Sequence, residues 1–169
     1  MALEFDELLA PVTDLGEHDL LASWRWLVGP DAKPLLLTAL GDLFVEQGTG
    51  EVFFLDTYEG SLKHVSNSRD DWKRALQEPH NLHAWFAPDL VAALRGRGLK
   101  LTEGQTYSPI QAPVLGGSMD ADNFECVPWR VHFIPMGQIH EQVKDLPPGT
   151  PIAGIDLKWA QPRPWWKFW

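Results

Sequence analysis

The alternation of hydrophobic and polar positions is clearest between residues 41 and 65. From 41 to 55, an apolar run rich in β-branched and aromatic residues, a Gly-rich turn at 47–50 and a second such run follow one another. Another turn then leads into a third run that ends at Val65. This order predicts an antiparallel meander of three strands. Leu62 and Val65 differ in parity, which predicts a bulge or an early end in the third strand.

Helical signals follow the meander. Ser68 is a predicted N-cap, because Asp71 three residues later resembles the second half of a capping box. After a proline break, a second helix is predicted to start near Asn81. We expect Pro88 to kink or restart that helix and the glycines of 96–98 to end it.

The remaining apolar stretches are shorter. Asp19 is a predicted cap for a short helix that ends at Gly29. Residues 129–135 alternate and predict a strand, whereas the pattern over 137–145 leaves a short helix and an edge strand open. A turn is predicted at 147–150, where two prolines precede a glycine.

Together these elements predict an α+β fold, in which an antiparallel meander packs with a few short helices as a single compact domain. The length of 169 residues suits one such core. We divide the chain into an N-terminal helical segment at 1–40, an α+β domain at 41–152 and a Trp-rich C-terminal tail at 153–169.

The charge balance narrows the class of partner. The chain has 23 acidic and 14 basic residues and a formal net charge of -9. Such a balance disfavours direct binding to nucleic acid and suits a basic protein partner. Cys126 is the single cysteine, so no internal disulfide is expected. The acidic first residues, and the lack of an apolar run of membrane-spanning length, predict a cytoplasmic protein without a membrane span.

One histidine motif suggests metal chemistry and then departs from it. His140 and Glu141 begin the zinc-protease pattern H-E-x-x-H, but Lys144 stands where the second histidine is needed. We expect His132 and His140 to bracket a turn at 135–137, with His140 hydrogen-bonding across to the strand that carries His132. This interpretation makes His140 part of a turn and interface scaffold. No motif in the sequence predicts a metal, a cofactor or a catalytic residue.

Acidic residues gather near the turns of the meander. Asp56 and Glu59 flank the turn after the second strand, and Asp42 lies near the start of the first. These three carboxylates are predicted to line one end of the sheet, although Asp and Glu also stabilise turns in the absence of any function. With Tyr58 they are the exposed acids and aromatics that we expect a protein partner to contact.

Several segments, read in order, resemble a known family. The most specific are Leu55-Asp56-Thr57, Val114-Leu115-Gly116-Gly117 with Asn123-Phe124, and Gly137-Gln138-Ile139-His140 running to Leu146-Pro147-Pro148-Gly149-Thr150. Residues 41–152 resemble the C-terminal domain of type VI secretion DNase immunity proteins, formerly a domain of unknown function. The residues of this motif that we single out as structural are Gly116, Gly117, Gly137, His140, Pro148 and Gly149.

The resemblance implies a small α+β domain in a cytoplasmic antitoxin that binds and blocks a cognate toxin, which in this family is a nuclease. A GAD-like segment often precedes the domain, and residues 1–40 are too short for a full one. We expect toxin binding through Asp42, Asp56, Tyr58 and Glu59, on an acidic surface that mimics or covers the nucleic-acid cleft of the toxin.

Two other functions remain open at this stage. One is a small hydrolase, metal-dependent or histidine-based, that uses His132, His140 and Glu125. The other is a peptide- or small-molecule-binding module that uses a Trp-rich surface. The C-terminal sequence, with tryptophans at 165, 166 and 169, fits a partner anchor, a membrane contact or a segment that folds back on its own domain.

Overall fold

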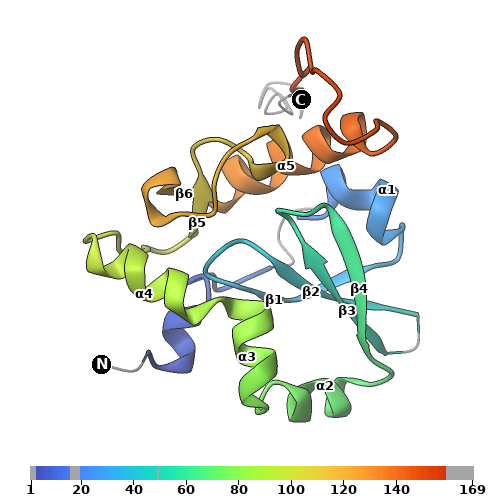
Figure 1. The fold of residues 1–169 in the computed structure, drawn as a ribbon. Coiled ribbons are helices and arrows are strands. Elements are labelled where there is room, and N and C mark those ends of the chain that lie inside the picture. The colour runs from blue at the N-terminus through green and yellow to red at the C-terminus, as the bar shows by residue number, and fades with distance from the viewer. Residues whose placement is uncertain (1–2, 16–19, 49, 159–169) are drawn as a thin grey trace, which may run out of the picture.

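The computed structural model describes residues 3–15, 20–48 and 50–158, and it confirms the predicted α+β fold (Figure 1). A four-stranded antiparallel sheet has the order β1-β2-β3-β4, and β5 and β6 form a separate antiparallel pair. The strands are β1 (Lys33–Leu37), β2 (Leu43–Gln47), β3 (Glu51–Asp56), β4 (Ser61–Ser66), β5 (Gln105–Pro109) and β6 (Phe124–Pro128).

Five α-helices surround these strands in the described part of the chain. They are α1 (Arg25–Val28), α2 (Arg69–Ala75), α3 (Pro79–Phe86), α4 (Pro88–Gly96) and α5 (Trp129–Val143). Short 3-10 helices occupy Phe5–Leu8, Ala22–Trp24, Pro113–Leu115 and Ala121–Asn123. In Figure 1, α1 and α5 lie above the sheet, whereas α2 and α3 lie below it.

The three predicted strands are β2, β3 and β4, and the predicted bulge is present in β4. β3 pairs with both β2 and β4, and its register against β4 shifts between Val52 and Phe53. Val52 faces Ser66 and Phe53 faces His64, so Val65 is the extra residue of the bulge. The sequence pattern did not indicate β1, which pairs with β2 and carries Pro34 at the edge of the sheet, where proline is tolerated.

The helix that follows the meander starts as predicted. The Ser68 hydroxyl accepts a hydrogen bond from the Asp71 amide at 3.1 Å, and Trp72 is buried. The next helix begins at Pro79 rather than at an Asn81 cap, and the side-chain amide of Asn81 instead donates to the Ala75 carbonyl at 2.9 Å. A break before Pro88 then starts α4, as expected.

The predicted strand at 129–135 and the turn at 135–137 are wrong, because both lie inside α5. The alternating letters also fit a helix, since the buried residues recur at spacings of three and four: His132, Phe133, Met136, Gly137, Ile139 and His140. Gly137 allows α5 to approach the Ala22–Trp24 helix, because an added Cβ would lie 2.5 Å from the Ser23 carbonyl oxygen.

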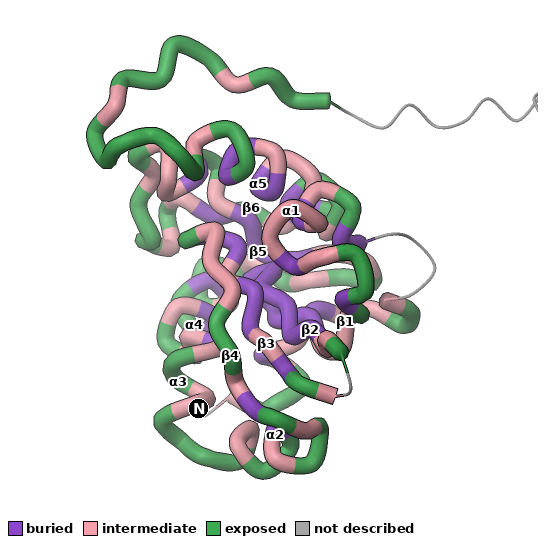
Figure 2. The backbone as a smooth tube through the Cα atoms, turned by 90° about the vertical axis from the view of Figure 1, so that its right-hand side faces the viewer, coloured by how far each residue is buried: buried purple, intermediate pink, exposed green. Residues whose placement is uncertain are grey.

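A single hydrophobic core runs from Leu8 to Ile139 and includes residues of every α-helix. Figure 2 shows this buried backbone through the sheet, β5, β6 and α5, and shows the segment after α5 as mostly exposed. Trp24 is fully buried and its indole donates to the Phe133 carbonyl at 3.1 Å. The division at residues 40 and 152 stays a prediction, and the tryptophans of the last eleven residues lie outside the described part of the chain.

Candidate functional site

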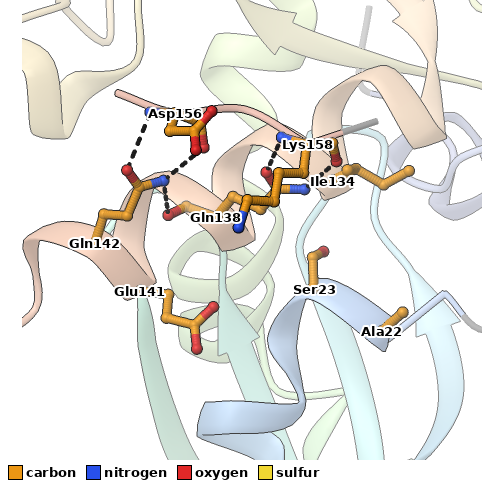
Figure 3. Close-up of a pocket in the computed structure, with 8 residues that line it drawn as sticks. All are labelled: Ala22, Ser23, Ile134, Gln138, Glu141, Gln142, Asp156 and Lys158. Atoms are coloured by element: carbon orange, nitrogen blue, oxygen red, sulfur yellow. Dashed lines mark hydrogen bonds between the residues drawn. The ribbon is translucent and has the colours of Figure 1, made fainter. Parts of the chain in front are cut away.

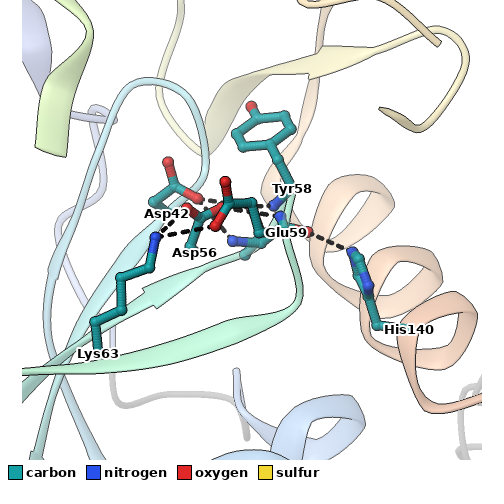
Figure 4. A network of polar contacts seen from close by, with 7 residues as sticks. Asp42, Asp56, Tyr58, Glu59, Lys63 and His140 are labelled. Carbon is teal, nitrogen blue, oxygen red and sulfur yellow. Dashed lines mark hydrogen bonds and ion pairs between the residues drawn. The ribbon is translucent and has the colours of Figure 1, made fainter. Parts of the chain in front are cut away.

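Thr57, in the turn between β3 and β4, joins three parts of the molecule. Its amide donates to Asp42 Oδ1 at 2.8 Å, and its hydroxyl donates to the same oxygen at 3.0 Å. The hydroxyl oxygen also lies 2.9 Å from Nε2 of His132 on α5, and the Thr57 carbonyl oxygen lies 3.0 Å from Nε2 of His140. Figure 4 shows His140 reaching this turn from α5.

These contacts define a directed chain of buried hydrogen bonds. With the Thr57 hydroxyl donating to Asp42, all of these contacts are satisfied when a neutral His132 donates from Nε2 and accepts at Nδ1 from the Ser108 hydroxyl 3.0 Å away. Burial lowers the pKa of His132 from 6.5 to about 3, so its ring is neutral and suits this arrangement. Burial also lowers the pKa of His140, against the opposing effect of its hydrogen bond to Thr57.

Each of the two histidines therefore contacts Thr57, and they do not hydrogen-bond to each other. They lie two turns apart on one face of α5, and the expected hydrogen bond from His140 to a strand carrying His132 is wrong for that reason. His140 also packs against Gly60, where an added Cβ would lie 2.3 Å from the imidazole. As a scaffold, the pair fastens the β3–β4 turn to α5.

The residues named for a hydrolase are only partly brought together. Glu125 and His132 line one cavity of about 330 Å³ with Ser108, whereas His140 faces the Thr57 turn instead. His132 is fully buried, and both ring nitrogens are engaged within the protein. Within 3–15, 20–48 and 50–158, no three histidine, cysteine or acidic side chains are placed to hold a metal ion.

The acidic residues lie at one end of the sheet, as predicted, but two of the four expected contact residues are not exposed (Figure 4). Asp42 is 7% exposed and Tyr58 is 8% exposed. Asp42 is buried because it caps the Thr57 turn, and Tyr58 because its hydroxyl donates to the Leu40 carbonyl. Burial, and then the negative charge of Asp56, raise the pKa of Asp42 well above its usual value.

Asp56 and Glu59 are more accessible. Asp56 Oδ1 accepts hydrogen bonds from the amides of Tyr58 and Glu59 at 3.2 and 3.0 Å, which fixes the turn. Lys63 on β4 places its ammonium 3.3 Å from Asp56 and 3.0 Å from Glu59. The hydrogen bond to Glu59 is the main reason that the pKa of Lys63 is raised.

A cavity of about 330 Å³ opens beside these acids. All four predicted contact residues line it, together with apolar residues from β3, α3 and the loop before β6: Phe54, Trp85, Pro113 and Met119. The sequence pattern gave neither Trp85 nor Met119 a role in a site. Only the fold brings α3 and that loop against the end of the sheet, so no local signal could have found them.

A second cavity, of about 550 Å³, lies between α5, the Ala22–Trp24 helix and the segment after α5 (Figure 3). Gln138 and Gln142 each exchange two hydrogen bonds with the backbone of that segment. Gln138 pairs with Lys158 at 2.7 and 2.6 Å, and Gln142 pairs with Asp156 at 3.0 and 3.1 Å. These contacts hold the backbone at Asp156 and Lys158 against α5.

The remaining motif residues shape loops. Gly116 and Gly117 follow the Pro113–Leu115 helix. The side-chain amide of Asn123 closes their loop by donating to the Gln111 and Ser118 carbonyls at 2.8 and 2.7 Å. Pro148 and Gly149 form the predicted turn after α5, in which the Thr150 amide donates to the Pro147 carbonyl at 3.1 Å.

Fold and site together define a small α+β domain, with a buried polar chain that fixes one turn and an acidic, aromatic cavity beside it. Residues 66–140 match the family described as T6SS immunity protein Tdi1, C-terminal, where T6SS is the type VI secretion system. The match confirms the resemblance identified in the sequence, over a shorter range than 41–152. It includes both histidines of α5 and excludes Thr57.

Other comparisons add little. No curated protein matches the chain. A structure titled "Crystal structure of Atu4351 from Agrobacterium tumefaciens" is 17% identical with a TM-score of 0.47. The alignment covers 69% of this chain and 62% of that one, so this chain spans less than two thirds of its length. No described helix is long and apolar enough to cross a membrane.

Proposed function

We propose that this chain is a non-enzymatic, cytoplasmic immunity protein, which binds and blocks a cognate toxin of a type VI secretion system. The match of residues 66–140 to an immunity family carries this proposal. The hydrogen bonds of His132 support a structural role for the polar residue that would otherwise be the best catalytic candidate. The toxin is proposed to be a nuclease, because a net charge of -9 complements a basic cleft that binds nucleic acid.

The proposed docking surface is the acidic end of the sheet. Asp56 and Glu59 form its accessible part, and Asp42 and Tyr58 form the inner wall of the adjoining cavity. The α+β region at 41–152 would carry this surface. The hydrogen bonds from α5 to Thr57 hold the turn in place, so the surface is preformed and loses little conformational entropy on binding.

Co-expression tests this function. If the function is right, a toxin encoded by a gene adjacent to this one should arrest growth when expressed alone. Cells should tolerate it when the full chain is co-expressed, and the two proteins should purify together. Continued arrest in the presence of well-folded chain, with no co-purification, would refute the immunity function. A toxin that is neutralised but lacks nuclease activity would refute only the nuclease assignment.

A further inference from the structure

One cavity adjoins the turn that carries Asp56 and Glu59. Asp42, which precedes β2, lines the same space as Asp56 and Glu59 at the β3–β4 turn, and Lys63 pairs with the latter two. Three carboxyl groups therefore share this space with one ammonium.

Asp42 is the carboxyl group of this cavity that pairs with no basic side chain of the described residues. It is 7% exposed, and Oδ1 accepts both hydrogen bonds from Thr57. In Figure 4 its other oxygen points away from these bonds. No ion pair to Asp42 forms within the described part of the chain, although Asp42 lines an open cavity. A cation at the second oxygen would favour the ionised form of this buried carboxyl group, so this position suits a basic ligand.

The walls of the cavity suit a basic side chain rather than a small hydrated ion. Phe54, Trp85 and Met119 provide an apolar lining, and Met119 is 44% exposed. Methylene groups of lysine or arginine pack on such surfaces, and a guanidinium also stacks on an aromatic face. The combination of apolar wall and recessed carboxylate therefore matches a long stem with a charged end.

Lys63 forms ion pairs with two of the acids that line the cavity. It pairs across the strands with Phe54, and its ammonium reaches Asp56 and Glu59 from a side chain that is 55% exposed. Exposed ion pairs of this kind contribute little to stability, so a ligand can displace Lys63 at small cost.

We propose that this cavity receives one lysine or arginine side chain of the toxin, with its stem along Phe54 and Trp85 and its charged end at Asp42, in competition with Lys63. The inference rests on the proposed function, since a toxin with a basic nucleic-acid cleft supplies such side chains on the surface that must be blocked. It adds the chemistry of the contact to the docking surface.

A small probe tests the cavity without the toxin. Butylguanidinium should shift the Trp85 indole N–H resonance of the full chain saturably, and uncharged butylurea should not. Asp42→Asn keeps an oxygen that accepts from Thr57, so the variant should fold. Its affinity for butylguanidinium should fall by about threefold or more. Lys63→Met should strengthen binding, and Asp70→Asn, on exposed α2, should leave it unchanged.

The outcomes separate this inference from the immunity function. Equal shifts with both probes, no saturable shift, or unchanged affinity in Asp42→Asn would overturn the cavity as a basic side-chain receptor. None of these results would affect neutralisation of the toxin in cells. Conversely, probe binding by a chain that fails to protect cells would leave the receptor standing and remove the immunity function.

Discussion

The hydroxyl oxygen of Thr57 lies 2.9 Å from Nε2 of His132, although 75 residues separate the two in the sequence. This contact holds the turn that carries Asp56 and Glu59 against α5, the longest helix of the described residues. Residues 66–140, which match the immunity family, supply His132 and His140, and the meander supplies the turn. The family-matching region thereby sets the position of the proposed docking surface without forming all of it.

Thr57→Val should destabilise the protein. It preserves shape but leaves the Nε2–H of His132 without its acceptor and removes one donor to Asp42 in a buried site. We expect a loss of about 2–4 kcal/mol in the free energy of unfolding, measured by urea titration. Thr102→Val removes an exposed hydroxyl and should change it by less than about 0.5 kcal/mol. Equal losses in the two variants would contradict a stabilising role for the buried hydrogen bonds of Thr57.

Acid should destabilise the fold through His132. Its folded pKa is about 3, so below pH 6.5 the unfolded chain binds a proton that the folded chain does not, and stability falls with pH until about 3. Between pH 7 and about pH 5 the loss should be about 2 kcal/mol from this group.

Two histidine variants isolate this effect. His132→Gln should be less stable at neutral pH and should show a flatter decline of stability toward acid. His64→Gln replaces a 44% exposed side chain and should keep the wild-type profile. Urea titrations at several pH values measure both, and an unaltered slope in His132→Gln would show that the acid sensitivity has another source.

Gly137→Ala should destabilise the protein, although alanine is normally favoured over glycine inside a helix. Alanine usually stabilises a helix interior by about 0.5–1 kcal/mol relative to glycine. At 137 its Cβ would lie 2.5 Å from the Ser23 carbonyl oxygen, so we expect a net loss of about 1–3 kcal/mol. Gly96→Ala, in α4 with nothing within 4 Å, should be neutral or stabilising. Thermal melts of the two proteins should therefore shift in opposite directions or differ clearly.

Charge reversal should slow toxin association. Asp56→Lys with Glu59→Lys replaces the accessible acids of the docking surface, and should lower the association rate constant by about tenfold at low salt. Asp70→Lys, on an exposed carboxylate of α2, is the matched control and should have a smaller effect. Stopped-flow mixing at about 50 and 500 mM salt measures this. An association rate constant that is unchanged in the double variant and at high salt would contradict an electrostatic basis for docking.

Local sequence signals predicted the central fold well. The meander, its bulge and the Ser68 cap depend on neighbouring residues, and all three are present. The same approach failed at 129–135, where alternation and Pro135 suggested a strand and a break. There the pattern fits two periods, and packing of the helix face on Trp24 selects the helix.

The site shows the same division. Placement of Asp42, Asp56 and Glu59 at one end of the sheet followed from the turn positions. The burial of Asp42 and Tyr58 did not, because it depends on hydrogen bonds to Thr57 and Leu40 made within the folded loops. Trp85 and Met119 line the cavity only because α3 and a distant loop pack together, and local sequence patterns do not predict such packing.

The central claim is that this protein acts by covering its partner and makes or breaks no bond. Titration of the purified toxin with the full chain, while toxin activity is followed, tests this most directly. The account predicts a linear loss of activity that is complete near molar equivalence, and full recovery of activity and unchanged toxin mass after the two are separated. Inactivation by a small molar fraction of the chain, with a cleaved or modified toxin, would contradict it.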